Sequence, residues 1–152
     1  MKTFLLFTLF ATALCADFGA GLRAYQQKDY AAALKEWQPL ADSGDPAAQF
    51  NLALMYLDGT GVPQSTDHAV EWFKRSADHG YTKAQYNLGG LYASGKGVKR
   101  NYVTAHMWLN LCSASGDAKC AAQRDLVAQK MKPKDLAEAQ RRAIEWKATP
   151  TK

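Results

Sequence analysis

The sequence lacks any hydrophobic run long enough to cross a membrane. Its longest apolar stretch, Phe4 to Leu14, has eleven residues, whereas a membrane-spanning helix needs about 20. Lys2 precedes this stretch, and the small residues that follow it end at Ala16. This order of charge, apolar run and small residues predicts a secretory signal peptide over residues 1–16 and an exported, non-transmembrane domain over residues 17–152.

Two cleavage sites fit the end of this signal peptide. Cleavage after Ala16 leaves Leu14 at a place that favours a small residue, whereas cleavage after Cys15 puts Ala13 there. Attachment of a lipid at Cys15 is disfavoured, because Leu14 stands where such sites carry a small residue and Thr12 where they carry leucine. The mature protein is expected in the periplasm or outside the cell.

Cysteine is scarce, and of three cysteines only Cys112 and Cys120 lie within the mature domain. Disulfides persist in the oxidising compartments that exported proteins occupy. The two cysteines stand eight residues apart across Gly116 and Asp117, at the expected end of one helix and the start of the next. Antiparallel neighbouring helices can bring them together, so we expect a disulfide, with two buried free thiols as the alternative.

Familiar catalytic signals are also missing, because no Ser-x-x-Lys, His-Glu-x-x-His or Gly-x-Ser-x-Gly string occurs. His68, His79 and His106 lack the spacing of metal ligands on one helix, and no second cluster of carboxylates or thiols completes a metal shell. Residues 90–97 approach the phosphate-loop pattern, but Gly97 stands where a hydroxyl must reach magnesium. We expect no enzyme, no metal or other cofactor and no nucleic-acid partner.

Negative charge is sparse in the last part of the chain. Residues 119–152 carry nine Lys and Arg against four Asp and Glu, whereas residues 17–118 are nearly balanced. The excess predicts either the solvated faces of a terminal helix pair or a basic patch for an acidic surface or anionic polymer. The patch residues are Lys130, Lys132, Lys134, Arg141 and Arg142.

A repeat of 36 residues is the main positive feature of the sequence. With this shift Ala48–Leu52 matches Ala84–Leu88, Gly59–Val62 matches Gly95–Val98, and Trp72 matches Trp108. A period of this length is typical of arrays in which each unit buries its apolar face against the next unit. The full units cover about 47–82 and 83–118, and partial units cover 19–46 and 119–147.

Within each full unit, the spacing of apolar residues predicts a helix hairpin. Ala48, Leu52 and Tyr56 recur at helical spacing. Gly59 ends this helix, because glycine accepts the left-handed backbone of a helix end, and a second apolar stripe follows over residues 69–77. No segment alternates as a strand does. The mature protein is therefore expected to be all-α, a solenoid of about four helix hairpins.

The string Ala84-Gln85-Tyr86-Asn87-Leu88-Gly89, followed by Tyr92 and Gly95-Lys96-Gly97-Val98, resembles the Sel1-like repeat, a longer-looped relative of the tetratricopeptide repeat. The resemblance implies an α/α superhelix whose concave face is lined by the first helix of each hairpin. It also implies an adaptor, scaffold or regulator that binds a protein or peptide. Cysteine-rich relatives are similar in the spacing of Cys112 and Cys120, and some are credited with binding or hydrolysing β-lactams, which is an alternative function.

The helical register places the candidate binding residues. If Leu52, Ala53 and Tyr56 face the core, the opposite stripe turns towards the concave side. The candidates are Phe50, Asn51, Leu54, Asp58, Tyr86, Asn87 and Ser94. For Asn51 and Asn87 the alternative is a hydrogen bond to a neighbouring carbonyl or helix end. The leading function is therefore protein or peptide binding on this face, and binding of an anionic cell-envelope polymer by the basic patch is the alternative.

Overall fold

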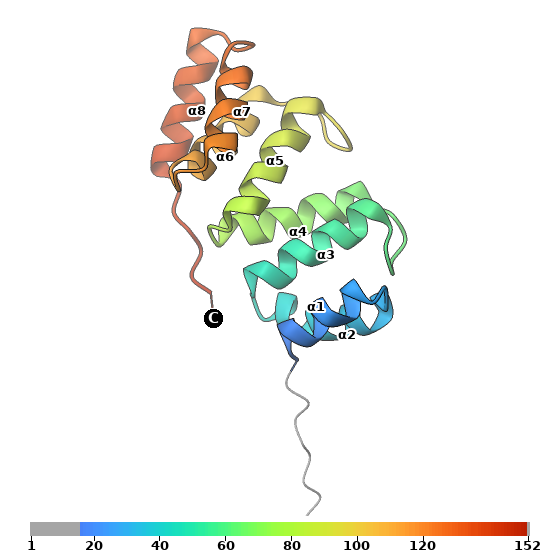
Figure 1. The fold of residues 1–152 in the computed structure, drawn as a ribbon. Coiled ribbons are helices and arrows are strands. Elements are labelled where there is room, and N and C mark those ends of the chain that lie inside the picture. The colour runs from blue at the N-terminus through green and yellow to red at the C-terminus, as the bar shows by residue number, and fades with distance from the viewer. Residues whose placement is uncertain (1–15, 152) are drawn as a thin grey trace, which may run out of the picture.

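The computed structural model describes residues 16–151, in which all regular structure is helical. The helices are α1 (Phe18–Gln26), α2 (Tyr30–Asp42), α3 (Pro46–Asp58), α4 (Thr66–Asp78), α5 (Thr82–Ser94), α6 (Tyr102–Ser113), α7 (Ala118–Ala128) and α8 (Pro133–Glu145). They pack as consecutive hairpins, α1 with α2, α3 with α4 and α5 with α6, while α7 and α8 both pack against α6 (Figure 1). The predicted all-α solenoid is confirmed.

The predicted signal peptide falls, apart from Ala16, on residues 1–15. These residues, including Cys15, lie outside the described part of the chain. Among residues 16–151, none of the helices has both the length and the apolar character needed to span a bilayer.

Local sequence sets the helix boundaries. Asp45 caps α3, because its Oδ1 accepts a hydrogen bond from the backbone nitrogen of Ala48 at 2.7 Å. Gly59 ends α3 with a φ of 72°, and Gly95 ends α5 with a φ of 73°. Glycine adopts this left-handed conformation without strain. The predicted glycine stop is confirmed in both full units.

The core is built from large and small residues that alternate between neighbouring helices. Trp37 in α2 and Phe73 in α4, which are 36 residues apart, are both fully buried. Gly21 of α1 lies directly against the indole of Trp37, and Gly89 of α5 lies against Leu109 of α6. The missing side chains let the two helices of a hairpin approach closely around a large residue.

Buried glutamines connect successive hairpins. Gln49 Nε2 donates a hydrogen bond to the carbonyl of Ala41 at 3.0 Å, and Gln85 Nε2 donates to the carbonyl of Ala77 at 3.3 Å. Both glutamines are almost completely buried. Each carbonyl belongs to the last turn of the preceding hairpin, so the same polar contact fixes the position of each full unit on the unit before it.

The chain after α8 turns back towards the middle of the array (Figure 1). The ring of Trp146 lies edge-on to that of Trp108, with ring centroids 6.3 Å apart. Further along, the backbone nitrogen of Thr149 donates to the carbonyl of Asp78 at 2.6 Å. This C-terminal strap, residues 146–150, therefore joins the last hairpin to the end of α4.

Candidate functional site

The first helix of each hairpin presents one stripe of side chains away from the core. In α5 the buried residues are Ala84, Gln85, Leu88, Gly89 and Leu91. Because the helix turns once every 3.6 residues, the opposite stripe contains Lys83, Tyr86, Asn87, Gly90 and Ser94. Three of these five were predicted from the sequence, and Lys83 and Gly90 were not.

Structurally equivalent positions on the first helices form a row across the molecule. Gly21 packs on Trp37 as Gly89 packs on Leu109, so residues of α1 are equivalent to residues of α5 that lie 68 positions later. Two repeats of 36 residues would give a separation of 72. The shorter offset follows from the short connection between α1 and α2. The resulting row, which we call the leucine row, is Leu22, Leu54, Gly90 and Leu126.

Exposed apolar side chains concentrate on these first helices. The large hydrophobic residues exposed in the described chain are Leu22 at 41%, Tyr86 at 38%, Leu126 at 53% and Ile144 at 83%. The first three lie on α1, α5 and α7, on the stripes that face away from the core. We call the leucine row together with Phe50, Lys83, Tyr86 and Lys119 the first-helix face.

A hollow of about 300 Å³ opens on the first-helix face. It is lined by Phe50, Thr82, Lys83, Tyr86, Asn87, Asp117 and Lys119. These residues come from α3, α5 and the start of α7, so three successive units contribute to one depression. Phe50, Tyr86 and Asn87 are the predicted binding residues that the fold brings together here.

Phe50 and Tyr86, although equivalent in the repeat, have different surroundings. The Phe50 ring is half-buried, with its centroid 5.7 Å from that of Phe73 and 5.3 Å from that of Tyr81. Tyr86 is exposed at the edge of the hollow. Phe50 therefore packs beneath the hollow, whereas Tyr86 leaves apolar surface exposed at its edge.

The other predicted residues lie outside the hollow or make local bonds. Asn87 Nδ2 donates to the carbonyl of Lys83 at 2.8 Å, and Ser94 Oγ donates to the carbonyl of Leu91 at 3.2 Å. Both bonds stay within α5 and support local structure. The remaining three are all on α3: Asn51 and Leu54 are half-buried, and Asp58 is exposed at the end of the helix.

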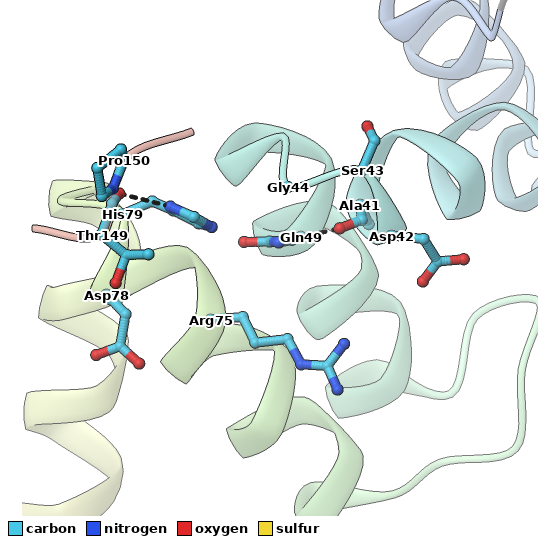
Figure 2. A pocket seen from close by; sticks show the side chains of 10 residues that line it. All are labelled: Ala41, Asp42, Ser43, Gly44, Gln49, Arg75, Asp78, His79, Thr149 and Pro150. Carbon is cyan, nitrogen blue, oxygen red and sulfur yellow. Dashed lines mark hydrogen bonds between the residues drawn. The ribbon is translucent and has the colours of Figure 1, made fainter. Parts of the chain in front are cut away.

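A second hollow, of about 340 Å³, lies where α2, α3, the end of α4 and the C-terminal strap meet (Figure 2). Figure 2 shows the Gln49 carboxamide with its nitrogen towards Ala41 and its oxygen on the side of His79. This oxygen is buried and has no hydrogen-bond partner among the described residues. The strap closes one side of the hollow, because His79 Nδ1 and the carbonyl of Thr149 are hydrogen-bonded at 2.8 Å.

The predicted basic patch is partly neutralised by its own helix. Arg141 Nη2 and Arg142 Nε donate to Glu138 Oε1 at 2.8 and 2.7 Å, and Arg141 also pairs with Glu145. Hydrogen bonds from Arg141 and Arg142 lower the pKa of Glu138 to about 2. The patch therefore presents mainly its lysines, Lys130, Lys132 and Lys134, which lie exposed near the turn between α7 and α8.

Cys112 near the end of α6 and Cys120 near the start of α7 form a disulfide, with their Cα atoms 5.7 Å apart. Both residues are buried. The bond fixes the first turn of α7, where Asp117 and Lys119 line the hollow. It therefore helps to hold one wall of the first-helix face.

Eight helices in stacked hairpins, with one hollow shared by three units, define a helical-repeat protein of a kind typical of protein binding. Two consecutive segments, residues 46–81 and 82–117, match the family model described as Sel1 repeat. The chain belongs to the Sel1 repeat family.

Two solved structures are similar to this chain. One is the crystal structure of c5321, described as a protective antigen present in uropathogenic Escherichia coli strains displaying an SLR fold, with 30% sequence identity and a TM-score of 0.77 over 84% of this chain and 29% of that chain. The other is a Sel1 repeat protein from Oxalobacter formigenes, with 27% identity and a TM-score of 0.70 over 86% of this chain and 56% of that chain. The chain thus spans less than two thirds of either relative. No curated protein sequence matches it.

Proposed function

We propose that this protein is an exported, non-catalytic repeat protein that binds a protein or peptide partner on its first-helix face. The observation that carries the proposal is the position of Leu22, Tyr86 and Leu126, which leave apolar surface exposed on the outward stripes of three first helices. Large apolar side chains that stay exposed on equivalent faces of successive units offer surface for such a contact, because contiguous exposed apolar surface marks interaction sites. Export is supported by the Cys112–Cys120 disulfide, which fits an oxidising compartment.

The chemistry of the hollow supports binding rather than catalysis. Its titratable side chains include two lysines and Asp117, whose Oδ1 accepts hydrogen bonds from the backbone nitrogens of Lys119 and Cys120 at 2.8 and 3.3 Å. This carboxylate acts as the cap of α7. Turnover of a chromogenic β-lactam by the purified protein would contradict the non-catalytic proposal and favour the enzyme alternative.

Site-specific crosslinking tests the binding face. A photoreactive amino acid is placed at Tyr86 or Leu126, and, as matched controls at exposed positions elsewhere, at Lys74 in α4 or Gln140 in α8. After irradiation of the cells that produce the protein, mass spectrometry identifies the adducts. We expect one partner to be crosslinked from both positions on the face and not from the controls.

The identified partner is then titrated against the purified protein. Leu126→Asp should weaken binding by at least about tenfold, since it places a charge in an apolar contact. Lys132→Glu with Lys134→Glu should leave it unchanged. Equal crosslinking from the control positions, or loss of binding in the lysine variant alone, would contradict the proposal and favour the basic patch.

A further inference from the structure

Gly90 interrupts the leucine row, although the described residues 16–151 leave room for a larger side chain at this position. A Cβ built on Gly90 would meet no atom within 4 Å, whereas one built on the adjacent Gly89 would collide with Leu109. Glycine in the interior of a helix is less favourable than alanine. The chain therefore keeps a destabilising residue where a larger one would fit, which is expected where another molecule approaches the backbone closely.

The missing side chain leaves a gap in the leucine row, where the backbone of α5 is not covered by a side chain. Leu54 and Leu126 hold the equivalent positions on α3 and α7, and Tyr86 lies one turn before Gly90 on the same stripe. Leu126 and Tyr86 are exposed. We call this place the Gly90 notch, and its surroundings would favour a large apolar side chain from a partner.

Positive charge lies about two helical turns from the notch. Lys83 and Lys119, which are equivalent in the repeat, both line the hollow, and neither forms an ion pair within the described chain. The side chains of Asp45 and Asp117 cap α3 and α7, whereas Tyr81, the N-cap residue of α5, forms no side-chain cap hydrogen bond. The positive end of the α5 dipole therefore adds to the charge of the two lysines.

We propose that the first-helix face takes an acidic peptide segment whose one large apolar side chain enters the Gly90 notch while Asp or Glu side chains reach Lys83 and Lys119. This inference rests on the proposed function and specifies the chemistry of the partner. Lys83 and Gly90 are seven residues apart in α5, so they are separated by about 10 Å along the helix axis. The acidic and apolar residues of the partner should therefore be about three residues apart if it is extended, or about seven if it is helical.

Selection from a random displayed-peptide library on the immobilised protein tests this chemistry. We expect the enriched peptides to share one large apolar residue and an acidic residue at one of these two spacings.

Synthetic, fluorescently labelled copies of the enriched peptides are then titrated by anisotropy against the protein and its variants. Gly90→Leu, which fills the notch, should weaken binding by at least about tenfold, and Gly90→Ala by much less. Lys83→Glu with Lys119→Glu should weaken binding at least as strongly as Gly90→Leu.

The controls separate this inference from the proposed function. Circular dichroism verifies that each variant is folded, and Lys132→Glu with Lys134→Glu should bind like the original chain. Peptides that lose binding in Leu126→Asp but keep it in Gly90→Leu, or that lack acidic residues, would overturn the inference and leave the proposed function standing. Failure to enrich any peptide sensitive to Leu126→Asp would count against both.

Discussion

Gly89 and Leu109 are in direct contact, because a Cβ built on Gly89 would lie 2.7 Å from Cδ2 of the completely buried Leu109. The next residue, Gly90, faces open space. Gly89→Ala should therefore lower the free energy of unfolding by about 1–3 kcal/mol through overpacking. Gly90→Ala should raise it by about 0.5–1 kcal/mol through helix propensity. Urea unfolding followed by circular dichroism measures both, and shifts of the same sign would contradict the two assignments.

The disulfide between Cys112 and Cys120 should contribute measurably to stability. Replacing both cysteines with alanine is expected to lower the free energy of unfolding by roughly 2–3 kcal/mol, because a closed loop restricts the unfolded chain. The same unfolding experiment, run with and without reductant on the original chain, provides the comparison. Alkylation of the denatured, unreduced protein should leave both cysteines unmodified, and two modified thiols would contradict the bond.

The C-terminal strap should stabilise the last two hairpins. Trp146→Ala removes the contact with Trp108, and a loss of about 2 kcal/mol is expected for a large, half-buried ring. Trp146→Phe keeps part of this contact and should cost less. Hydrogen exchange measured by mass spectrometry should show faster exchange in α6 and α8 of the alanine variant. Unchanged exchange there would mean that the strap is not a structural element.

Stability should decrease as the solution becomes mildly acidic, because burial and the nearby Arg124 lower the pKa of His106. The unfolded chain, with a histidine pKa of about 6.5, binds a proton before the folded chain does. The stability that neutral His106 contributes is therefore fully present above about pH 6.5, and it is lost as the pH falls towards the lower pKa of His106 in the folded state. Urea unfolding between pH 7 and about pH 5 measures the slope.

His106→Gln should reduce this slope, whereas the matched substitution of the exposed His68, His68→Gln, should preserve it. Equal slopes in the two variants would assign the acid sensitivity to other groups.

The helix hairpins of the middle of the chain could be predicted from the sequence because the ends of α3 and α5 are encoded locally. Glycine at positions 59 and 95 and the Ala and Leu spacing of α3 and α5 repeat after 36 residues, so one pattern supported the other. The first hairpin lacks the glycine loop, and its shorter connection changes the offset. A shift of 36 residues therefore does not align Leu22 with Leu54, and the repeat pattern alone did not identify Leu22 as part of the leucine row.

The contacts of the C-terminal strap and the lining of the hollow could not be predicted from local sequence patterns, because they join residues far apart in the chain. Nothing near Thr149 indicates that it pairs with Asp78, 71 residues earlier. Lys119 could have been found by shifting Lys83 by one repeat, and Leu126 by shifting Leu54 by two. The pairing of Arg141 and Arg142 with Glu138 was visible as helical spacing of three and four residues, although their joint effect on the charge of the patch needed the side-chain geometry.

The path of the strap also determines where the chain leaves the folded body. Thr149 and Pro150 lie beside the end of α4, in the second hairpin, although the preceding helix, α8, belongs to the fourth hairpin. A dye or affinity tag attached behind Pro150 would therefore report on the middle of the array. For distance measurements by fluorescence, a label on α8 itself is needed to follow the far tip of the molecule.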